Sequence, residues 1–228
     1  MTEIILRTDI EPHIDLAQLA ARLHAKPDTV TYRRAAELFE QAKPLLKPGY
    51  IIRCFPLTEL TADSFMLGGQ MFHSRVAAKM LKNQRESWVY IATSGREISE
   101  YIAAAESRFD QYLLDQIAYF ACMQAMDTML GDISLRLGIG RHMRLSPGSI
   151  IDWSVAEVKT FFTLLDGDYQ RLNLRVLDSG MIDPLKSVSG ILFPTEVEFA
   201  SCDICSRANC SDRKTLFNED KYYEMINL

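Results

Sequence analysis

One stretch, residues 110–138, carries the strongest helical periodicity in the chain and constrains its fold more than any other feature. Its apolar residues recur at helical spacing and are Leu113, Leu114, Ile117, Ala118, Ala121, Ala125, Met129, Leu130, Ile133 and Leu137. They cover more than one narrow face, which predicts a long helix that is buried on much of its circumference. Gly138 and Gly140 follow, and because glycine commonly ends a helix, we expect this one to stop there.

Shorter periodic stretches on both sides of this helix predict a mixture of helices and strands. We expect helices over residues 15–25, 28–45, 73–81, 96–106 and 154–165, and strands over 50–57, 64–67, 87–93, 174–177 and 187–193. The two kinds of element do not alternate strictly, which favours the α+β class. The 228 residues, 48% of them hydrophobic, suffice for one sizeable core. We expect a single domain over residues 1–228 with a cysteine-containing C-terminal segment at 200–228.

The charge of the chain narrows the classes of partner. A formal net charge of -5 argues against a nucleic-acid surface, which normally carries a basic excess. Residues 1–15 carry acids where a signal peptide has an apolar core, and no apolar run approaches ~20 residues. We therefore expect a cytoplasmic protein that binds a protein or a small molecule and contacts neither nucleic acid nor a membrane.

The segment RLSPGSIIDW, which follows the long helix, combines an arginine with a sharp turn. Pro147 fixes φ and Gly148 permits a positive φ, so we expect the backbone to turn there with exposed N–H groups. Arg144 lies just upstream of this turn. A forked guanidinium and backbone donors together can hold a carboxylate. The alternative is a plain connector between two helices with a surface arginine.

A second polar stretch, KSVSG at 186–190, enters an apolar strand. Lys186, Ser187 and Ser189, followed by Gly190, suit contact with a polar group of a ligand. The alternative is an ordinary strand whose lysine is solvated.

Three of the five cysteines, Cys202, Cys205 and Cys210, lie close together near the end of the chain. The C-x2-C spacing lets two thiolates bind one metal ion, and Cys210 can complete a three-thiolate set. Tetrahedral zinc needs a fourth ligand, as an iron–sulfur cluster usually does, and no histidine follows nearby. Cys54 or Cys122 would then supply it in space. The residues leave two hypotheses open: a zinc or Fe–S site, or a dithiol or inert triple.

The order of the motifs resembles a known family. A strand ends in Thr93-Ser94-Gly95, the long helix follows, and then come R-x-S-P-G at 144–148, FFTLLD at 161–166 and P-x-K-S-V-S-G at 184–190. This order resembles the S-adenosylmethionine-binding C-terminal reactivation domain of cobalamin-dependent methionine synthase. It resembles even more closely the free-standing versions of that domain, many of which end in a short cysteine-rich segment. The resemblance is best over residues 87–213.

The resemblance implies both a fold and a function. The fold is a single α+β domain with a bent, mostly antiparallel sheet flanked by helices. The function is to restore methylcobalamin after oxidation, with one electron from flavodoxin or a ferredoxin-like donor and a methyl group from S-adenosylmethionine. This chain would serve cobalamin-binding methionine synthase, or another corrinoid protein, as a stand-alone accessory module rather than as a complete enzyme.

The resemblance also implies a ligand site. The family motif R-x-x-x-G-Y matches this chain at Arg144 and Gly148, whereas Ser149 stands in the place of its tyrosine. An acidic residue of the long helix also binds the ligand in the family, and Asp127 is the best match by position. The implied S-adenosylmethionine site therefore comprises Arg144, Ser146, Pro147, Gly148, Ser149 and Asp127. Lys186, Ser187 and Ser189 are candidates for contact with the ligand or the corrinoid.

Two hypotheses of other classes stay open beside this resemblance. The first is a metal- or Fe–S-dependent electron-transfer or corrinoid-reducing protein that uses Cys202, Cys205 and Cys210. The second is a binding partner of a methyltransferase without chemistry of its own, which the serine at position 149 favours.

Overall fold

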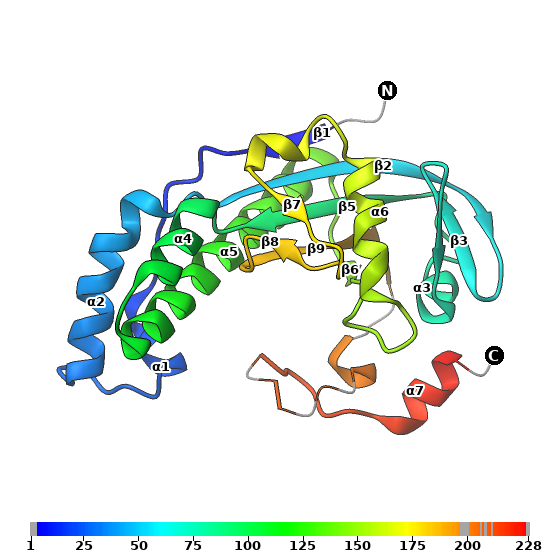
Figure 1. Ribbon diagram of the computed structural model, residues 1–228. Helices are drawn as coiled ribbons and strands as arrows, with labels where there is room; N and C mark the ends of the chain where they lie inside the picture. Colours follow the sequence, from blue (N-terminus) through cyan, green and yellow to red (C-terminus); the bar gives the residue numbers. More distant parts are fainter. Residues whose placement is uncertain (1–3, 197–200, 206, 208, 211, 227–228) are drawn as a thin grey trace.

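A computed structural model describes residues 4–196, 201–205, 207, 209–210 and 212–226 (Figure 1). A mostly antiparallel sheet runs through the molecule and helices flank it, so the predicted α+β class is confirmed. The main sheet has the strand order β4-β3-β2-β5-β9-β6, and β1 pairs with β2 off this path. Its strands are β1 (Ile4–Arg7), β2 (Gly49–Leu60), β3 (Ser64–Leu67), β4 (Gln70–His73), β5 (Glu86–Thr93), β6 (His142–Leu145) and β9 (Ser187–Pro194).

The strand β2 bends the sheet because it belongs to both of its halves. Its first eight residues pair with β5, and its last residues pair with the β3–β4 hairpin. The register shifts between Leu57 and Glu59, and an irregularity of this kind bends a strand and increases its twist. A separate small hairpin joins β7 (Arg175–Val176) to β8 (Ile182–Asp183).

The helices lie at one end of the sheet and on its faces (Figure 1). They are α1 (Leu16–Arg22), α2 (Val30–Ala42), α3 (Arg75–Met80), α4 (Arg96–Ala104), α5 (Arg108–Leu137), α6 (Val158–Leu164) and α7 (Glu219–Ile226). Short 3-10 turns accompany them at Lys43–Leu45, Val155–Glu157, Tyr169–Leu172 and Ser201–Ile204.

Helix α5 is the predicted long helix. It runs for 30 residues, about 45 Å at the α-helical rise. Its first half packs among α1, α2 and α4 through buried residues that include Leu114 and Ile117. Its second half packs on the sheet, where Met126 and Met129 join one core with side chains of β2 and β5. One helix therefore connects the helical layer to the sheet.

Alternation along the central strands divides the core between the two faces of the sheet. Val89 and Ile91 of β5 join the core that contains α6 and Trp153. Tyr90 and Ala92 of the same strand join the core formed with α5. Alternate residues along β5 therefore face α5, and those between them face α6.

The structure differs from the sequence prediction in a few elements. Residues 142–145 form an edge strand where we expected a loop, and His73 ends the strand 70–73, so the helix expected from residue 73 begins at Arg75. The strand expected at 174–177 shrinks to the two residues of β7. Stretches as short as these show too little periodicity for their secondary structure to be predicted from sequence. Their conformation depends on the strands with which they pair in the fold.

The C-terminal segment passes below the body of the molecule and ends in α7 (Figure 1). Asp203 holds this segment together, because its carboxylate accepts hydrogen bonds from Thr215 (2.5 Å) and Lys221 (2.8 Å). The Arg213 guanidinium donates to the carbonyl oxygens of Cys202 and Cys205 at 3.0 and 2.8 Å. Among the residues that the structure describes, no helix combines the length and the apolar character needed to cross a bilayer.

Candidate functional site

The edge strand β6 places Arg144 toward helix α5. Met143 and Leu145 are buried in the core on the α6 face, so the intervening residue faces the other way. Arg144 pairs across the strands with Leu192, whose side chain belongs to the core on the α5 face. The guanidinium therefore lies on the same side of the sheet as Tyr90 and Met126.

Because Gly190 has no side chain, three polar groups lie close to it: the Leu145 carbonyl oxygen and the hydroxyl groups of Ser146 and Tyr90. In the register of β5 and β9 it lies opposite Tyr90. A Cβ at this position would lie 2.6 Å from the Ser146 hydroxyl oxygen and 2.8 Å from the Tyr90 hydroxyl oxygen. Both hydroxyl groups therefore border the space that the missing side chain leaves. Burial raises the pKa of Tyr90 despite nearby Arg144, so the phenol stays protonated at neutral pH.

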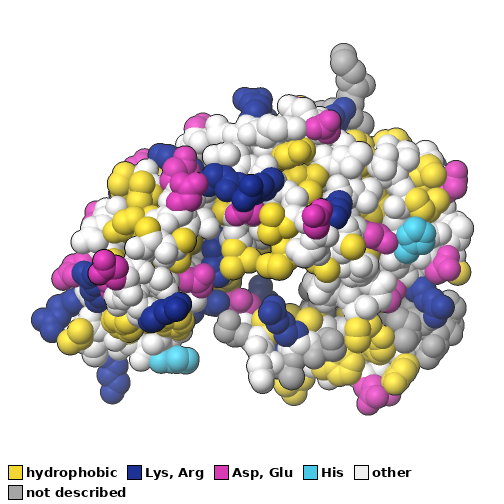
Figure 2. Space-filling model, viewed as in Figure 1, with side chains coloured by type: hydrophobic (Ala, Val, Ile, Leu, Met, Phe, Trp, Pro, Cys, Tyr) yellow, Lys and Arg dark blue, Asp and Glu magenta, His cyan; other side chains and the backbone are white. Residues whose placement is uncertain are grey.

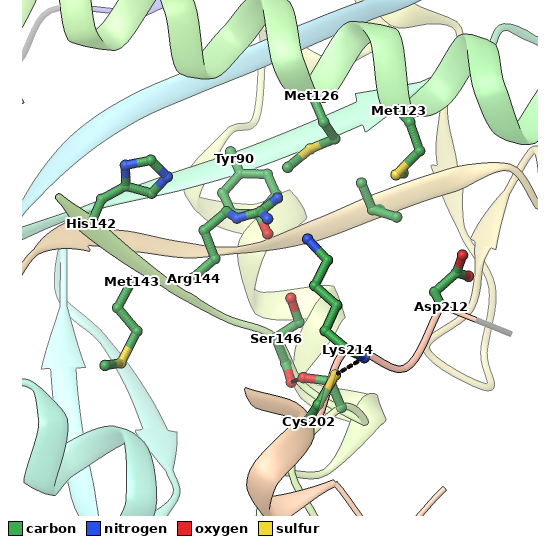
Figure 3. A pocket seen from close by; sticks show the side chains of 12 residues that line it. Tyr90, Met123, Met126, His142, Met143, Arg144, Ser146, Cys202, Asp212 and Lys214 are labelled. Carbon is green, nitrogen blue, oxygen red and sulfur yellow. Dashed lines mark hydrogen bonds between the residues drawn. The ribbon is translucent and has the colours of Figure 1, made fainter. Parts of the chain in front are cut away.

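A pocket of about 470 Å³ opens between β5, β6, α5 and the C-terminal segment (Figure 3). Its walls combine thioether and aromatic surface with a few charged groups. The lining residues are Tyr90, Met123, Met126, His142, Met143, Arg144, Ser146, Ser149, Val188, Cys202, Asp212 and Lys214. The volume lies in the range of small-molecule sites, and half of the lining residues are polar or charged.

Pro147 and Gly148 are not part of the pocket lining, and their turn offers fewer backbone donors than we expected. Gly148 has a φ of 76°, the conformation that glycine tolerates. Its N–H donates to the Trp153 carbonyl oxygen at 2.8 Å, and the Ser149 N–H donates to the Ser146 carbonyl oxygen at 3.1 Å. The expectation that these N–H groups are free is therefore wrong, because the turn closes on itself. The Arg144 guanidinium is left as the donor for a carboxylate.

Ser149 has a second bond inside this turn. Its hydroxyl donates to the Ser146 carbonyl oxygen at 2.6 Å, and the residue still lines the pocket. A serine therefore tightens the loop at the position where the family motif has a tyrosine. Tyr90, from the neighbouring strand, places an aromatic ring against the pocket instead (Figure 3).

The pocket contains two cationic side chains without a counterion. Neither the Arg144 guanidinium nor the Lys214 ammonium group forms an ion pair within the described part of the chain. Asp212, also in the lining, is held by Arg22 Nη1 at 2.5 Å and by the Tyr119 hydroxyl at 2.7 Å. Burial acts to raise the pKa of Asp212, but these hydrogen bonds and charges hold it below its ordinary value.

The other predicted site residues lie away from the pocket lining. Asp127 is exposed on α5. Lys186 forms an ion pair with Asp115 of α5 at 2.9 Å. The Ser187 hydroxyl hydrogen-bonds Thr93 and the Pro184 carbonyl oxygen, and Ser189 is buried. Lys186 and Ser187 thus have structural partners, and the predicted roles of all four residues in ligand or corrinoid contact stay predictions.

The three C-terminal cysteines are not gathered around a common point. Within the described residues, no group of three or more His, Cys, Asp or Glu side chains is placed to hold a metal ion. Cys202 lines the pocket, where its sulfur accepts the Lys214 N–H at 3.5 Å. Burial raises the pKa of both Cys54 and Cys122 to about 12, so neither is a ready thiolate for a fourth ligand position.

Several pocket residues carry no signal in the sequence that marks them as functional. The sequence predicts the strand that contains Tyr90 only as a buried strand. That Tyr90 faces α5 is known only once the structure shows which face of the sheet α5 covers. Met123 and Met126 follow the i, i+3 spacing of α5 and are indistinguishable there from core residues. Asp212 and Lys214 belong to a polar tail that tertiary packing alone brings to the pocket.

The fold and the pocket define a class: an α+β domain whose bent antiparallel sheet borders a pocket at an edge strand. No protein-family model matches the sequence, and a search of curated proteins finds no match. Among solved structures, the chain is similar to the crystal structure of the MetH reactivation domain bound to AdoHcy, with a TM-score of 0.64. The match covers 100% of this chain and 89% of that one at 14% identity. The shared feature at this identity is the fold.

Proposed function

We propose that the pocket beside Arg144 binds S-adenosylmethionine and its product S-adenosylhomocysteine. The observation that carries the proposal is the Arg144 guanidinium, which has no ion-pair partner among the described residues and lines a pocket of about 470 Å³ together with Tyr90, Met123 and Met126. A guanidinium binds a carboxylate through two parallel hydrogen bonds. The thioether and aromatic surfaces suit the sulfur-bearing chain and the adenine ring of such a ligand.

We further propose that the chain is a stand-alone reactivation module for a cobalamin-dependent methyltransferase, with methionine synthase as the partner. The fold shared with the MetH reactivation domain supports this role, as does the order of motifs along the chain. S-adenosylmethionine supplies the methyl group, and flavodoxin or a ferredoxin-like protein supplies the electron. The part of this chain is to hold the methyl donor at an open pocket that a corrinoid protein can approach.

Calorimetric titration with S-adenosylmethionine tests the binding proposal. We expect the wild-type protein to bind and Arg144→Ala to bind roughly 10- to 100-fold more weakly, since a hydrogen-bonded charged contact is worth about 1.5–3 kcal/mol. Arg141→Ala is the matched control, because Arg141 is exposed on the same segment and does not line the pocket. Absence of binding by the wild-type protein would remove the methyl-donor role.

A spectroscopic assay tests the partner proposal separately. A methionine synthase that lacks its own reactivation domain, in the inactive cob(II)alamin form, is mixed with reduced flavodoxin, S-adenosylmethionine and this protein. We expect the cob(II)alamin spectrum to decay faster with the wild-type protein than with Arg144→Ala. Equal decay with and without the protein would contradict the reactivation role and leave the binding role to stand on the titration.

A further inference from the structure

The C-terminal segment forms one wall of the pocket. Cys202, Asp212 and Lys214 all line it, although they follow the last strand of the main sheet and belong to no strand themselves. Figure 2 shows that this segment and the helical layer leave an open notch between them, with basic side chains at its border. The segment on which cysteine spacing suggested a metal site therefore borders the pocket.

Lys214 extends from this wall toward Arg144 and Tyr90 (Figure 3). Two cations from separate parts of the chain thus converge on the same end of the pocket. Both lack an ion-pair partner in the described ranges. Like charges repel, and the repulsion is stronger beside apolar surface such as Met126 than in open water. A carboxylate between the two groups would convert this repulsion into two charge-assisted hydrogen bonds.

Asp212 occupies a different side of the same pocket in Figure 3. Its carboxylate is fixed in place by Arg22 and Tyr119, at 2.5 and 2.7 Å. The lowered pKa of Asp212 keeps this carboxylate ionised at neutral pH. Asp212 is the acid in the pocket lining, whereas Asp127 lies outside it.

We propose that the C-terminal segment completes recognition of the amino-acid end of the ligand, with Arg144 and Lys214 binding the α-carboxylate and Asp212 binding the α-ammonium. This inference rests on the proposed function and deepens it, because it specifies the zwitterionic amino-acid group as the part of the ligand that the site recognises. Asp212 then takes the role that the family resemblance assigns to an acid of the long helix.

Titrations with two ligands test this inference on the full chain. S-adenosylhomocysteine carries the amino-acid end, and 5′-methylthioadenosine lacks it. We expect Lys214→Gln and Asp212→Asn each to weaken binding of S-adenosylhomocysteine about tenfold or more. Their affinity for 5′-methylthioadenosine should stay within about twofold of wild type, because the lost contacts involve charges that this ligand lacks.

Two controls separate ligand contact from changes in folding. Lys159→Gln and Asp178→Asn alter an exposed pair, 3.7 Å apart, outside the pocket lining and should leave both affinities unchanged. Tyr119→Phe removes one hydrogen bond to Asp212 but keeps its charge, so it should preserve the preference for S-adenosylhomocysteine. The thermal midpoint of Lys214→Gln without ligand should equal or exceed that of wild type, because the variant removes one of the two cations that extend toward the same end of the pocket.

The outcomes distinguish this inference from the proposed function. If the wild-type protein binds S-adenosylhomocysteine and both variants bind it equally well, the inference is overturned and the proposed function stands. If Asp212→Asn weakens both ligands alike, Asp212 acts by anchoring the segment, and its contact with the ammonium is overturned. If the wild-type protein binds neither ligand, the proposed function fails and the inference fails with it.

Discussion

At the residue scale, Gly190 is the position on which the local geometry of the pocket depends most directly. A Cβ there would lie 2.5 Å from the Leu145 carbonyl oxygen and 2.6 Å from the Ser146 hydroxyl oxygen. We expect Gly190→Ala to lower the free energy of unfolding by about 1–3 kcal/mol, the usual cost of overpacking. The added methyl group should also displace the Ser146 and Tyr90 side chains, which line the pocket, and so weaken ligand binding. Chemical denaturation and calorimetry measure the two effects.

Gly131 is the matched control for this substitution. It lies inside helix α5, and no atom lies within 4 Å of the position that a Cβ would occupy. Gly131→Ala should raise the free energy of unfolding by about 0.5–1 kcal/mol, because alanine loses less backbone entropy in a helix. Equal effects of the two substitutions would mean that Gly190 carries no special steric constraint.

At the element scale, Asp183 ties the β7–β8 hairpin to helix α4. Its carboxylate accepts Arg96 at 3.0 Å and Arg175 at 2.5 Å. Partial burial acts to raise the pKa of Asp183, but the hydrogen bonds and charges of the two arginines lower it below 3.8. Because the folded-state pKa is the lower one, this group stabilises the fold above pH 3.8, and the contribution is lost as pH falls through the folded-state pKa.

Asp183→Asn tests this linkage. We expect the variant to lower the free energy of unfolding by about 1 kcal/mol at pH 7, since it replaces charged contacts with weaker neutral ones. The difference from wild type should shrink as pH falls below about 4, the ordinary range of a carboxyl group. Urea denaturation at several pH values measures this. Asp178→Asn, which changes an exposed residue of the same hairpin, should leave the free energy of unfolding unchanged at every pH measured.

At the scale of the whole molecule, Asp212 joins the C-terminal segment to the helical layer through Arg22 and Tyr119. Arg22 of α1 donates to Asp212 and also lies over the Tyr119 ring, 3.9 Å from its centroid. We expect Arg22→Ala to release this segment, so that trypsin cleaves near Arg213 and Lys214 several times faster than in wild type. When the segment opens and closes faster than trypsin cleaves, the cleavage rate follows the fraction of molecules in which the segment is released. Time courses followed by mass spectrometry measure the rate.

Two comparisons complete this experiment. Arg33→Ala, on an exposed face of α2, should leave the cleavage rate unchanged. S-adenosylhomocysteine should slow cleavage of the wild-type protein, because a ligand that binds the closed form stabilises it by mass action. Unchanged cleavage of Arg22→Ala would show that other contacts, such as the 2.8 Å hydrogen bond from Lys79 to the Glu224 carbonyl oxygen, suffice to hold the segment.

The sequence predicted the elements with strong local patterns and missed those without them. The apolar spacing of 110–138 predicted α5, and the run at 87–93 predicted β5 within a residue of its bounds. The strand β6 is four residues long, and its pairing with β9 rather than its own composition makes it a strand. The predicted candidates Arg144, Ser146 and Ser149 line the pocket, because they follow one another along a single strand and turn.

Two properties were determined by the sequence alone: the α+β mixture of elements and the arginine that precedes a Pro-Gly turn. Both depend on residues close together in the chain, where propensity and periodicity act. The composition of the pocket was decided only by the tertiary structure, because Tyr90, Met126, Arg144 and Lys214 come from four distant segments. Helical phase turns Asp127 away, about 100° from Met126, and chain folding brings in Asp212 instead. Local patterns do not encode which segments pack together, and the lining of this pocket follows from that packing.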